Sequence, residues 1–225
     1  MGLNASQALE IETVALDLFK KQAHLWLDSN TWTATTQILE WWTLMQHHSA
    51  PTRMLDWTKS PYVAAYFAIE QDFEEDGTVW IVHAPTIRAA MKRRYKIDGL
   101  LPDDEMRKLL FASDAPPILW ITERSTLTSR MVAQQGLFSF CAQVLADHAD
   151  VLRSVVEPDH DKHVYSRVTI PARLKREFLR RLTAVNITAN VLFPGVDGLG
   201  RSIAEFVRVS AYTEARAKPT APLRS

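Results

Sequence analysis

The spacing of apolar residues changes along this chain, and that change restricts the fold class more than any other feature. Up to His48, apolar residues recur at three- and four-residue intervals, which is typical of amphipathic helices, so we expect helices over 6–27 and 33–48. After Gly77, short apolar runs alternate with helical segments. The runs, which we interpret as strands, cover residues 78–83, 117–122, 136–141 and 163–170. The pattern predicts an α+β protein whose N-terminal helices pack on a small mixed or split β-sheet.

The length of 225 residues suits a single domain with one core. We expect residues 1–32 to form an N-terminal helix of that domain and residues 33–212 to form its main body. Residues 213–225 are mostly Ala, Pro, Arg, Lys and Ser without an apolar period, so we expect a disordered tail.

The charge balance and the cysteine content limit the class of protein. Lys plus Arg equals Asp plus Glu, 26 of each, whereas proteins that bind nucleic acid or anionic membranes usually carry a basic surplus. The single cysteine, Cys141, excludes an intrachain disulfide and a Cys-based zinc site. The first residues lack the basic start and apolar run of a signal peptide, and the chain has no apolar run long enough to span a membrane. We therefore expect a cytoplasmic protein without membrane contact.

A polar loop between two expected helices is the main candidate for a functional site. It runs from Ser49 to Lys59, and Ser60-Pro61 then restarts a helix with a hydroxyl cap followed by proline in the first turn. Arg53 and Asp56 are close enough in sequence to form a bidentate pair. One interpretation is that this pair only fastens the loop, with Trp57 in the core.

The other interpretation is a binding site for an anionic small molecule. Helix N-termini attract anions, and a phosphate placed before Pro61 would meet Ser60, Thr58 and Arg53. Two histidines close the preceding helix, where the helix dipole favours a protonated ring. The candidate ligand-binding residues are His47, His48, Thr52, Arg53, Thr58 and Ser60.

Three motifs, in order, resemble those of the FRG-domain family. The first comprises Gln46-His47-His48, Pro51 to Thr58, Ser60-Pro61 and Ala64 to Ala68; the second comprises Arg130 with Ala133 to Phe138; the third comprises Leu192-Phe193-Pro194 with Asp197-Gly198-Leu199. They cover roughly residues 40–201. The Phe-Arg-Gly triplet that names the family is absent from this chain, so it resembles a truncated or degenerate member.

A more distant resemblance, to ADP-ribosyltransferases that use NAD, suggests a chemistry. It implies that an arginine and hydroxyls hold the phosphates and ribose of NAD, and that an acidic residue stabilises an oxocarbenium-like transition state. The catalytic candidates are then Arg53, Asp56 and Gln135. Gln135 stands where the transferases have glutamate, and an amide cannot offer negative charge to a developing cation.

These residues and resemblances suggest three alternative functions. The first is an NAD-dependent, ADP-ribosyltransferase-like effector or toxin that modifies a protein target. The second is a non-catalytic module that binds a nucleotide-like ligand or a protein. The third, a nucleic-acid-processing enzyme, rests on the basic cluster at 88–96 and on Arg173, Arg176 and Arg180 along one helical face. We expect no metal: the residues Asp147, His148, Asp150, Asp159, His160, Asp161 and His163 have no recognised ligand spacing and are interpreted as a short helix and a polar loop.

Overall fold

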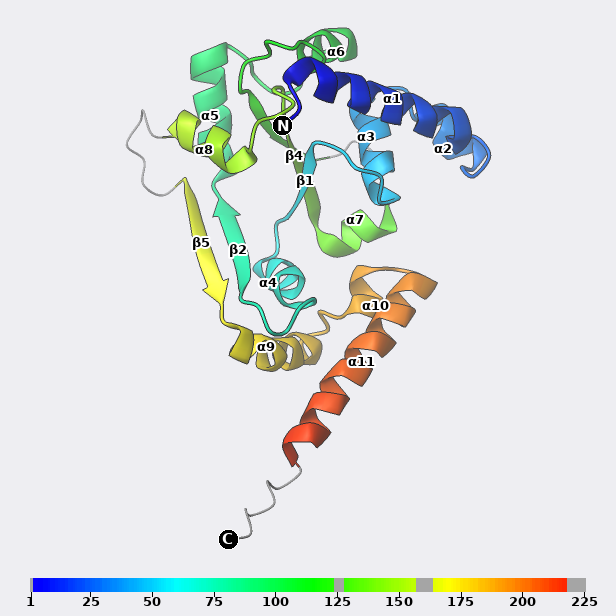
Figure 1. Ribbon diagram of the computed structural model, residues 1–225, viewed down its shortest axis with the longest axis vertical. Coiled ribbons are helices and arrows are strands. Elements are labelled where there is room, and N and C mark those ends of the chain that lie inside the picture. The colour runs from blue at the N-terminus through cyan, green and yellow to red at the C-terminus, as the bar shows by residue number, and fades with distance from the viewer. Residues whose placement is uncertain (1, 124–127, 157–163, 218–225) are drawn as a thin grey trace. The chain divides into compact units, whose positions relative to one another are not determined.

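The computed structural model describes residues 2–123, 128–156 and 164–217, and it has the expected α+β composition (Figure 1). The chain divides into two compact units. The first consists of Met1–Trp57, Val82–Ser125 and Leu137–Ser166; the second consists of Thr58–Ile81, Thr126–Gly136 and Arg167–Ser225. The chain therefore passes from one unit to the other several times.

Three helices open the first unit, α1 (Ala5–Ala23), α2 (Ser29–Ala34) and α3 (Ile38–His47). Asn4 caps α1 by accepting a hydrogen bond from the backbone N–H of Gln7. The helix expected over 33–48 begins later, at Ile38. The residues before it form a separate short helix, α2. Its N-cap is Asp28, whose carboxylate accepts a hydrogen bond from the backbone N–H of Thr31.

A three-stranded sheet in the order β1-β4-β3 lies in the core of the first unit. Strands β3 (Leu119–Thr122) and β4 (Gly136–Cys141) pair antiparallel with Trp120 opposite Phe140, and their rings stack at 5.1 Å. Both strands are largely buried, as their apolar runs predict. The edge strand β1 (Met54–Thr58) was not predicted. It occupies part of the segment that we interpreted as an irregular loop.

Three further helices belong to the first unit: α5 (Ala84–Tyr95), α6 (Asp103–Leu110) and α8 (His148–Val156). Helix α5 packs against α8 and β3, and it places Ile87, Ala90 and Met91 in the core. The sequence of α6 begins with Asp103, Asp104 and Glu105, which complement the helix dipole at its N-terminus.

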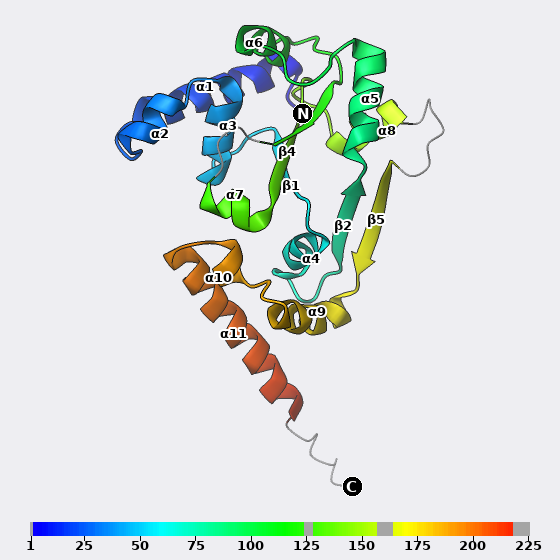
Figure 2. The ribbon, with the colours of Figure 1, turned by 180° about the vertical axis from the view of Figure 1, so that it is seen from behind.

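Strands β2 (Gly77–Val82) and β5 (Tyr165–Ile170) form a separate two-stranded sheet (Figure 2). Both strands were predicted. An apolar run such as that of β2 is typical of a buried strand, but most of its side chains are exposed. A paired strand covers the edge of β2 and neither of its faces, so its side chains are buried only where another element packs on the sheet. Gly77 approaches α4 so closely that a Cβ atom would lie 2.1 Å from the carbonyl oxygen of Ala68.

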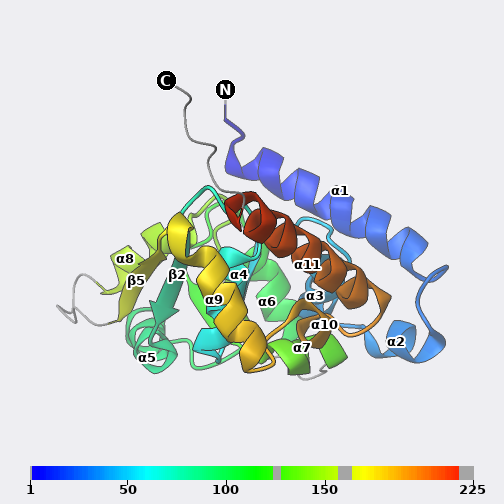
Figure 3. The same ribbon diagram turned by 90° about the horizontal axis from the view of Figure 1, so that it is seen from below.

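The second unit contains α4 (Pro61–Ile69), α7 (Ser129–Gln134), α9 (Ala172–Ala184), α10 (Ala189–Leu192) and α11 (Val196–Ala217). Figure 3 shows α4, α9 and α10 with α11 beside them. The core of this unit is an apolar cluster contributed by α4, α9, α10 and the end of β5. Its buried members are Val63, Tyr66, Ile69, Ile170, Leu179, Leu182, Ala189, Leu192 and Phe193.

The predicted disordered tail is wrong in its first part. Helix α11 continues to Ala217, so residues 213–217 are helical, and residues 218–225 lie outside the described residues. The absence of an apolar period in 213–217 removed the signal on which a helix prediction depends, although several of these residues are good helix formers.

Candidate functional site

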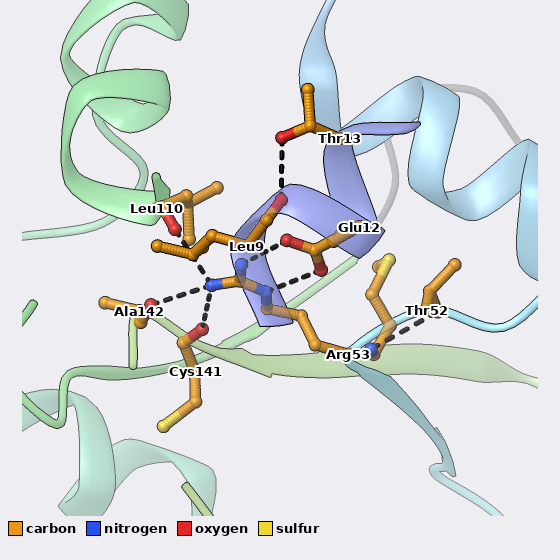
Figure 4. A network of polar contacts seen from close by, with 9 residues as sticks. Leu9, Glu12, Thr13, Thr52, Arg53, Leu110, Cys141 and Ala142 are labelled. Carbon is orange, nitrogen blue, oxygen red and sulfur yellow. Dashed lines mark hydrogen bonds and ion pairs between the residues drawn. The ribbon is translucent and has the colours of Figure 1, made fainter. Parts of the chain in front are cut away.

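Arg53 immediately precedes β1, and its guanidinium is held by a carboxylate from the first helix (Figure 4). Its Nε donates to Oε1 of Glu12 at 2.8 Å, and its Nη2 donates to Oε2 of the same carboxylate. The pair is bidentate, which is the strongest geometry for an arginine with a carboxylate. Both side chains are buried, with exposed fractions of 6% and 12%.

The other end of the same guanidinium is directed at backbone carbonyl groups. Nη1 lies 2.7 Å from the oxygen of Ala142, 3.1 Å from that of Leu110 and 3.4 Å from that of Cys141 (Figure 4). The guanidinium also lies 5.0 Å from the ring of Trp42, a cation–π distance. The N–H groups of Arg53 are thus turned to protein acceptors inside the first unit. The expected role of Arg53 as a phosphate ligand has no support from these contacts.

The suggested pairing of Arg53 with Asp56 is wrong. The carboxylate partner of Arg53 is Glu12, and Asp56 is exposed. Side chains of an extended segment alternate between its two faces, so positions three apart point in opposite directions. Trp57, in the same strand, is half-buried and donates its indole N–H to Oγ of Ser139 at 2.8 Å.

The two predicted histidines lie at the end of α3 in the first unit. His47 is the last residue of the helix and His48 is its C-cap, and their rings meet edge to face at 5.0 Å. The next residue, Ser49, has a positive φ of 62°. The hydroxyl of Thr52 donates to Oε1 of Gln46 at 2.7 Å and accepts from the N–H of Met54. Thr52 therefore stabilises the turn between α3 and β1.

Thr58 and Ser60 cap the start of α4, as the sequence predicts. Ser60 Oγ accepts from the N–H of Val63 at 3.4 Å, and Thr58 Oγ1 accepts from the N–H of Ser60 at 3.0 Å. Pro61 has no N–H to offer. The expected anion site at this helix N-terminus therefore has most of its hydrogen-bonding groups committed to the cap.

Within the second unit, Thr58 and Ser60 lie beside the second sequence motif. Thr58 Oγ1 donates to the carbonyl oxygen of Gln134 at 2.7 Å, and the N–H of Lys59 donates to that of Gln135 at 3.1 Å. Gln135 ends α7 in the left-handed conformation, with φ of 50°, and its side chain is exposed. Of the predicted site residues, the second unit thus brings together Thr58, Ser60 and Gln135.

The third sequence motif contacts the second one in the same unit. Nε2 of Gln134 donates to the carbonyl oxygen of Leu192 at 3.0 Å, the last residue of α10. The next residue, Phe193, makes cation–π contacts with two arginines. The guanidinium of Arg130 lies 4.7 Å from the centroid of the Phe193 ring, and that of Arg201 lies 4.2 Å from it. We call Arg130 and Arg201 the arginine pair. Sequence reasoning placed Arg130 in a motif but did not select either arginine for the site.

Two carboxyl groups with little solvent exposure lie in the same unit as the arginine pair. Glu205, on α11, accepts a hydrogen bond from the hydroxyl of Tyr66, and burial together with this hydrogen bond raises the pKa of the tyrosine. Glu70, at the end of α4, lies 3.6 Å from Nη1 of Arg201. Burial raises the pKa of Glu70 above its ordinary value, although Arg201 acts in the opposite direction.

Several residues of the two basic clusters, on which the nucleic-acid-processing hypothesis rests, form ion pairs or hydrogen bonds within the protein. On α9, Arg176 pairs with Glu74 and Arg180 pairs with Glu177. In the cluster at 88–96, Lys92 pairs with Asp98 and Arg94 donates to the carbonyl oxygen of Ser154. Surface charges with such partners present less positive potential to a polyanion.

No group of three or more His, Cys, Asp or Glu that could hold a metal ion occurs among residues 2–123, 128–156 and 164–217. Asp159, His160, Asp161 and His163 lie outside this range, so the interpretation of the His/Asp segment stays a prediction there. Asp147 caps α8 through the N–H groups of Ala149 and Asp150. In the part of the chain that the structure describes, no helix combines the length and apolar character needed to cross a membrane.

Comparison with known proteins gives one match. The family model of the FRG domain matches residues 3–77, which include Glu12, Arg53 and the whole of α4. This confirms the family that the first motif resembles. The match begins at the first helix and does not include the second and third motifs, for which the resemblance stays a prediction. No curated protein and no solved structure matches the chain.

Proposed function

The chain carries an FRG domain over residues 3–77, and from this premise we propose that its second unit binds an anionic, nucleotide-like ligand at the arginine pair. The observation that carries the proposal is the placement of two guanidinium groups on one ring, that of Phe193. They lie where three motifs far apart in the sequence meet.

The electrostatics of this arrangement favour an anion. Glu70 lies beside Arg201 on one side, and a phosphate near the exposed part of this guanidinium and near Arg130 would be a further anionic partner for the two cations. Arginine is suited to phosphate because its planar fork offers parallel N–H donors. The side chain of Arg201 is 47% exposed and is therefore accessible to a ligand.

The surroundings of the arginine pair offer polar groups in addition to charge. Lys59 is exposed on the loop that bonds to Gln135, and the side chain of Gln135 is itself exposed. An amide can donate to and accept from ribose hydroxyls or a base edge. This combination of cations and amides is typical of sites that bind a phosphorylated, hydroxyl-rich ligand rather than a bare anion.

A thermal-shift titration of the full chain with ADP, ADP-ribose, NAD and inorganic pyrophosphate tests the proposal. A ligand that binds only the folded state raises the melting temperature with its concentration. We expect such a shift for the wild-type protein and its loss in Arg201→Ala and Arg130→Ala. Arg173→Ala, which removes an exposed arginine of α9 in the same unit, is the matched control and should keep the shift. No shift with any of the four compounds would contradict the proposal, as would shifts equal in all three variants.

The second candidate is NAD turnover with a protein target. The residues that the transferase resemblance assigns do not fit it, since Arg53 is bonded to Glu12 and Gln135 carries no charge. One observation favours NAD turnover. The carboxyl group of Glu70 lies beside Arg201 and could serve as the acidic group that the transferases use. Release of nicotinamide from NAD by the wild-type protein, and its loss in Glu70→Gln with ligand binding retained, would support it. Binding without release would leave the protein a non-catalytic module.

A further inference from the structure

Helix α11 presents its more polar face to its own unit and its more apolar face to solvent. The face directed inward carries Gly198, Ser202, Glu205 and Val209, of which Gly198 and Glu205 are buried. The face directed outward carries large apolar side chains that are 52–83% exposed. We call it the α11 stripe, and its members are Val196, Leu199, Ile203, Phe206 and Val207. A helix of a globular protein normally has the opposite arrangement.

The spacing of the α11 stripe is that of a helix–helix seam. Val196, Leu199, Ile203 and Phe206 follow one another at intervals of three, four and three residues, as do positions a and d of a heptad. The exposed positions that flank such a seam are Gly200 and Val207, neither of which is charged. A second α11 could therefore approach closely without placing like charges opposite each other.

We propose that the α11 stripe pairs with the same stripe of a second copy of this chain, forming a two-fold homodimer. Its five side chains offer on the order of 500 Å² per copy, so the pair would bury about 1,000 Å², the lower limit for a specific interface. Exposed apolar patches of this size commonly mark interaction sites. The equal numbers of acidic and basic residues, 26 each, mean that two copies do not repel through net charge.

Sedimentation velocity of the full chain tests the pairing, over about 1 to 100 μM, where interfaces of this size dissociate. We expect a monomer–dimer equilibrium for the wild-type protein. Phe206→Glu should be monomeric over the whole range with an unchanged circular dichroism spectrum, because it places a charge in the seam. Val185→Glu is the matched control: Val185 is exposed to a similar degree, lies in the same unit and is outside the stripe, so this variant should dimerise as the wild type does.

Two results would overturn the proposal. One is a wild-type chain that stays monomeric up to the highest concentration. The other is a dimer that survives in Phe206→Glu, which would assign dimerisation to another surface. If Phe206→Glu loses helical signal, the milder Phe206→Ser decides between the outcomes, because it removes the apolar contact without adding charge.

Discussion

Glu12 and Arg53 lie 41 residues apart in the sequence and form a bidentate ion pair with little solvent exposure. A buried charge that loses its partner is left without water to solvate it, which is why breaking one half of such a pair is costly. The pair also fixes the position of the backbone at the start of β1 relative to α1.

Replacing either member alone should therefore destabilise the protein. We expect Arg53→Ala to lower the free energy of unfolding by about 3–5 kcal/mol and Glu12→Ala by a similar amount. The double variant Glu12→Ala/Arg53→Ala, which removes both charges, should lose clearly less than the sum of the single variants. Urea unfolding followed by circular dichroism measures all four proteins. Additive losses would show that the two side chains do not interact in solution.

Substitution by alanine should have opposite effects on stability at two glycines of α11. A Cβ on Gly198 would lie 1.8 Å from the carbonyl oxygen of Phe193, whereas a Cβ on Gly200 meets nothing within 4 Å. Gly198→Ala should therefore lower the melting temperature because α10 and α11 must separate. Gly200→Ala should stabilise the protein by up to about 1 kcal/mol through helix propensity. Equal effects of the two substitutions in calorimetry would contradict the close approach of these helices.

The buried carboxyl group of Glu70 predicts a pH dependence. Burial raises its pKa in the folded state above the ordinary value of 4.5, so the folded protein binds this proton more tightly than the unfolded chain does. Its contribution to stability is then complete below pH 4.5 and is lost as the pH rises through the raised pKa. Glu70→Gln should remove this loss and be the more stable protein at neutral pH. Urea titrations from acid to neutral pH, with the exposed Glu75→Gln as control, test the expectation; a Glu75→Gln profile that matches that of Glu70→Gln would refute it.

Cys141 should be unreactive in the folded protein. Its side chain is 1% exposed, and burial raises the pKa of its thiol to about 12. Since the thiolate is the nucleophile, a disulfide reagent such as DTNB should react only when the chain unfolds. We expect no fast phase with the native protein and complete reaction in guanidinium chloride. A rapid stoichiometric reaction without denaturant would show that β4 opens readily at its end.

Local signals in the sequence predicted local structure well. The cap at Ser60 was predicted from its side chain and the proline that follows it, and it is present. The bounds of β4 agree with those of the predicted strand, whose start is marked by Gly136. Strand β1 was missed because five residues with mixed burial give neither an apolar run nor a clean alternation.

The candidate site was less predictable because its contacts are distant in sequence or involve the backbone. Arg53 was selected as a catalytic and ligand-binding candidate, but its acceptors include the carbonyl groups of Leu110 and Ala142, and residue types do not reveal backbone acceptors. Tyr66 and Glu205 meet across 139 residues. The arginine pair depends on the close approach of α10 and α11, which only the packing of the second unit determines.

The position of Arg53 also bears on whether the FRG segment is a transferable module. Residues 3–77 contain both Glu12 and Arg53, whereas the carbonyl groups that complete the coordination of the guanidinium belong to residues 110, 141 and 142. A fragment cut at residue 77 would keep the ion pair but leave the remaining N–H groups of Arg53 without their acceptors. The segment that the family model matches therefore depends on later residues to satisfy its buried arginine, and a graft of it onto another protein would have to include those residues.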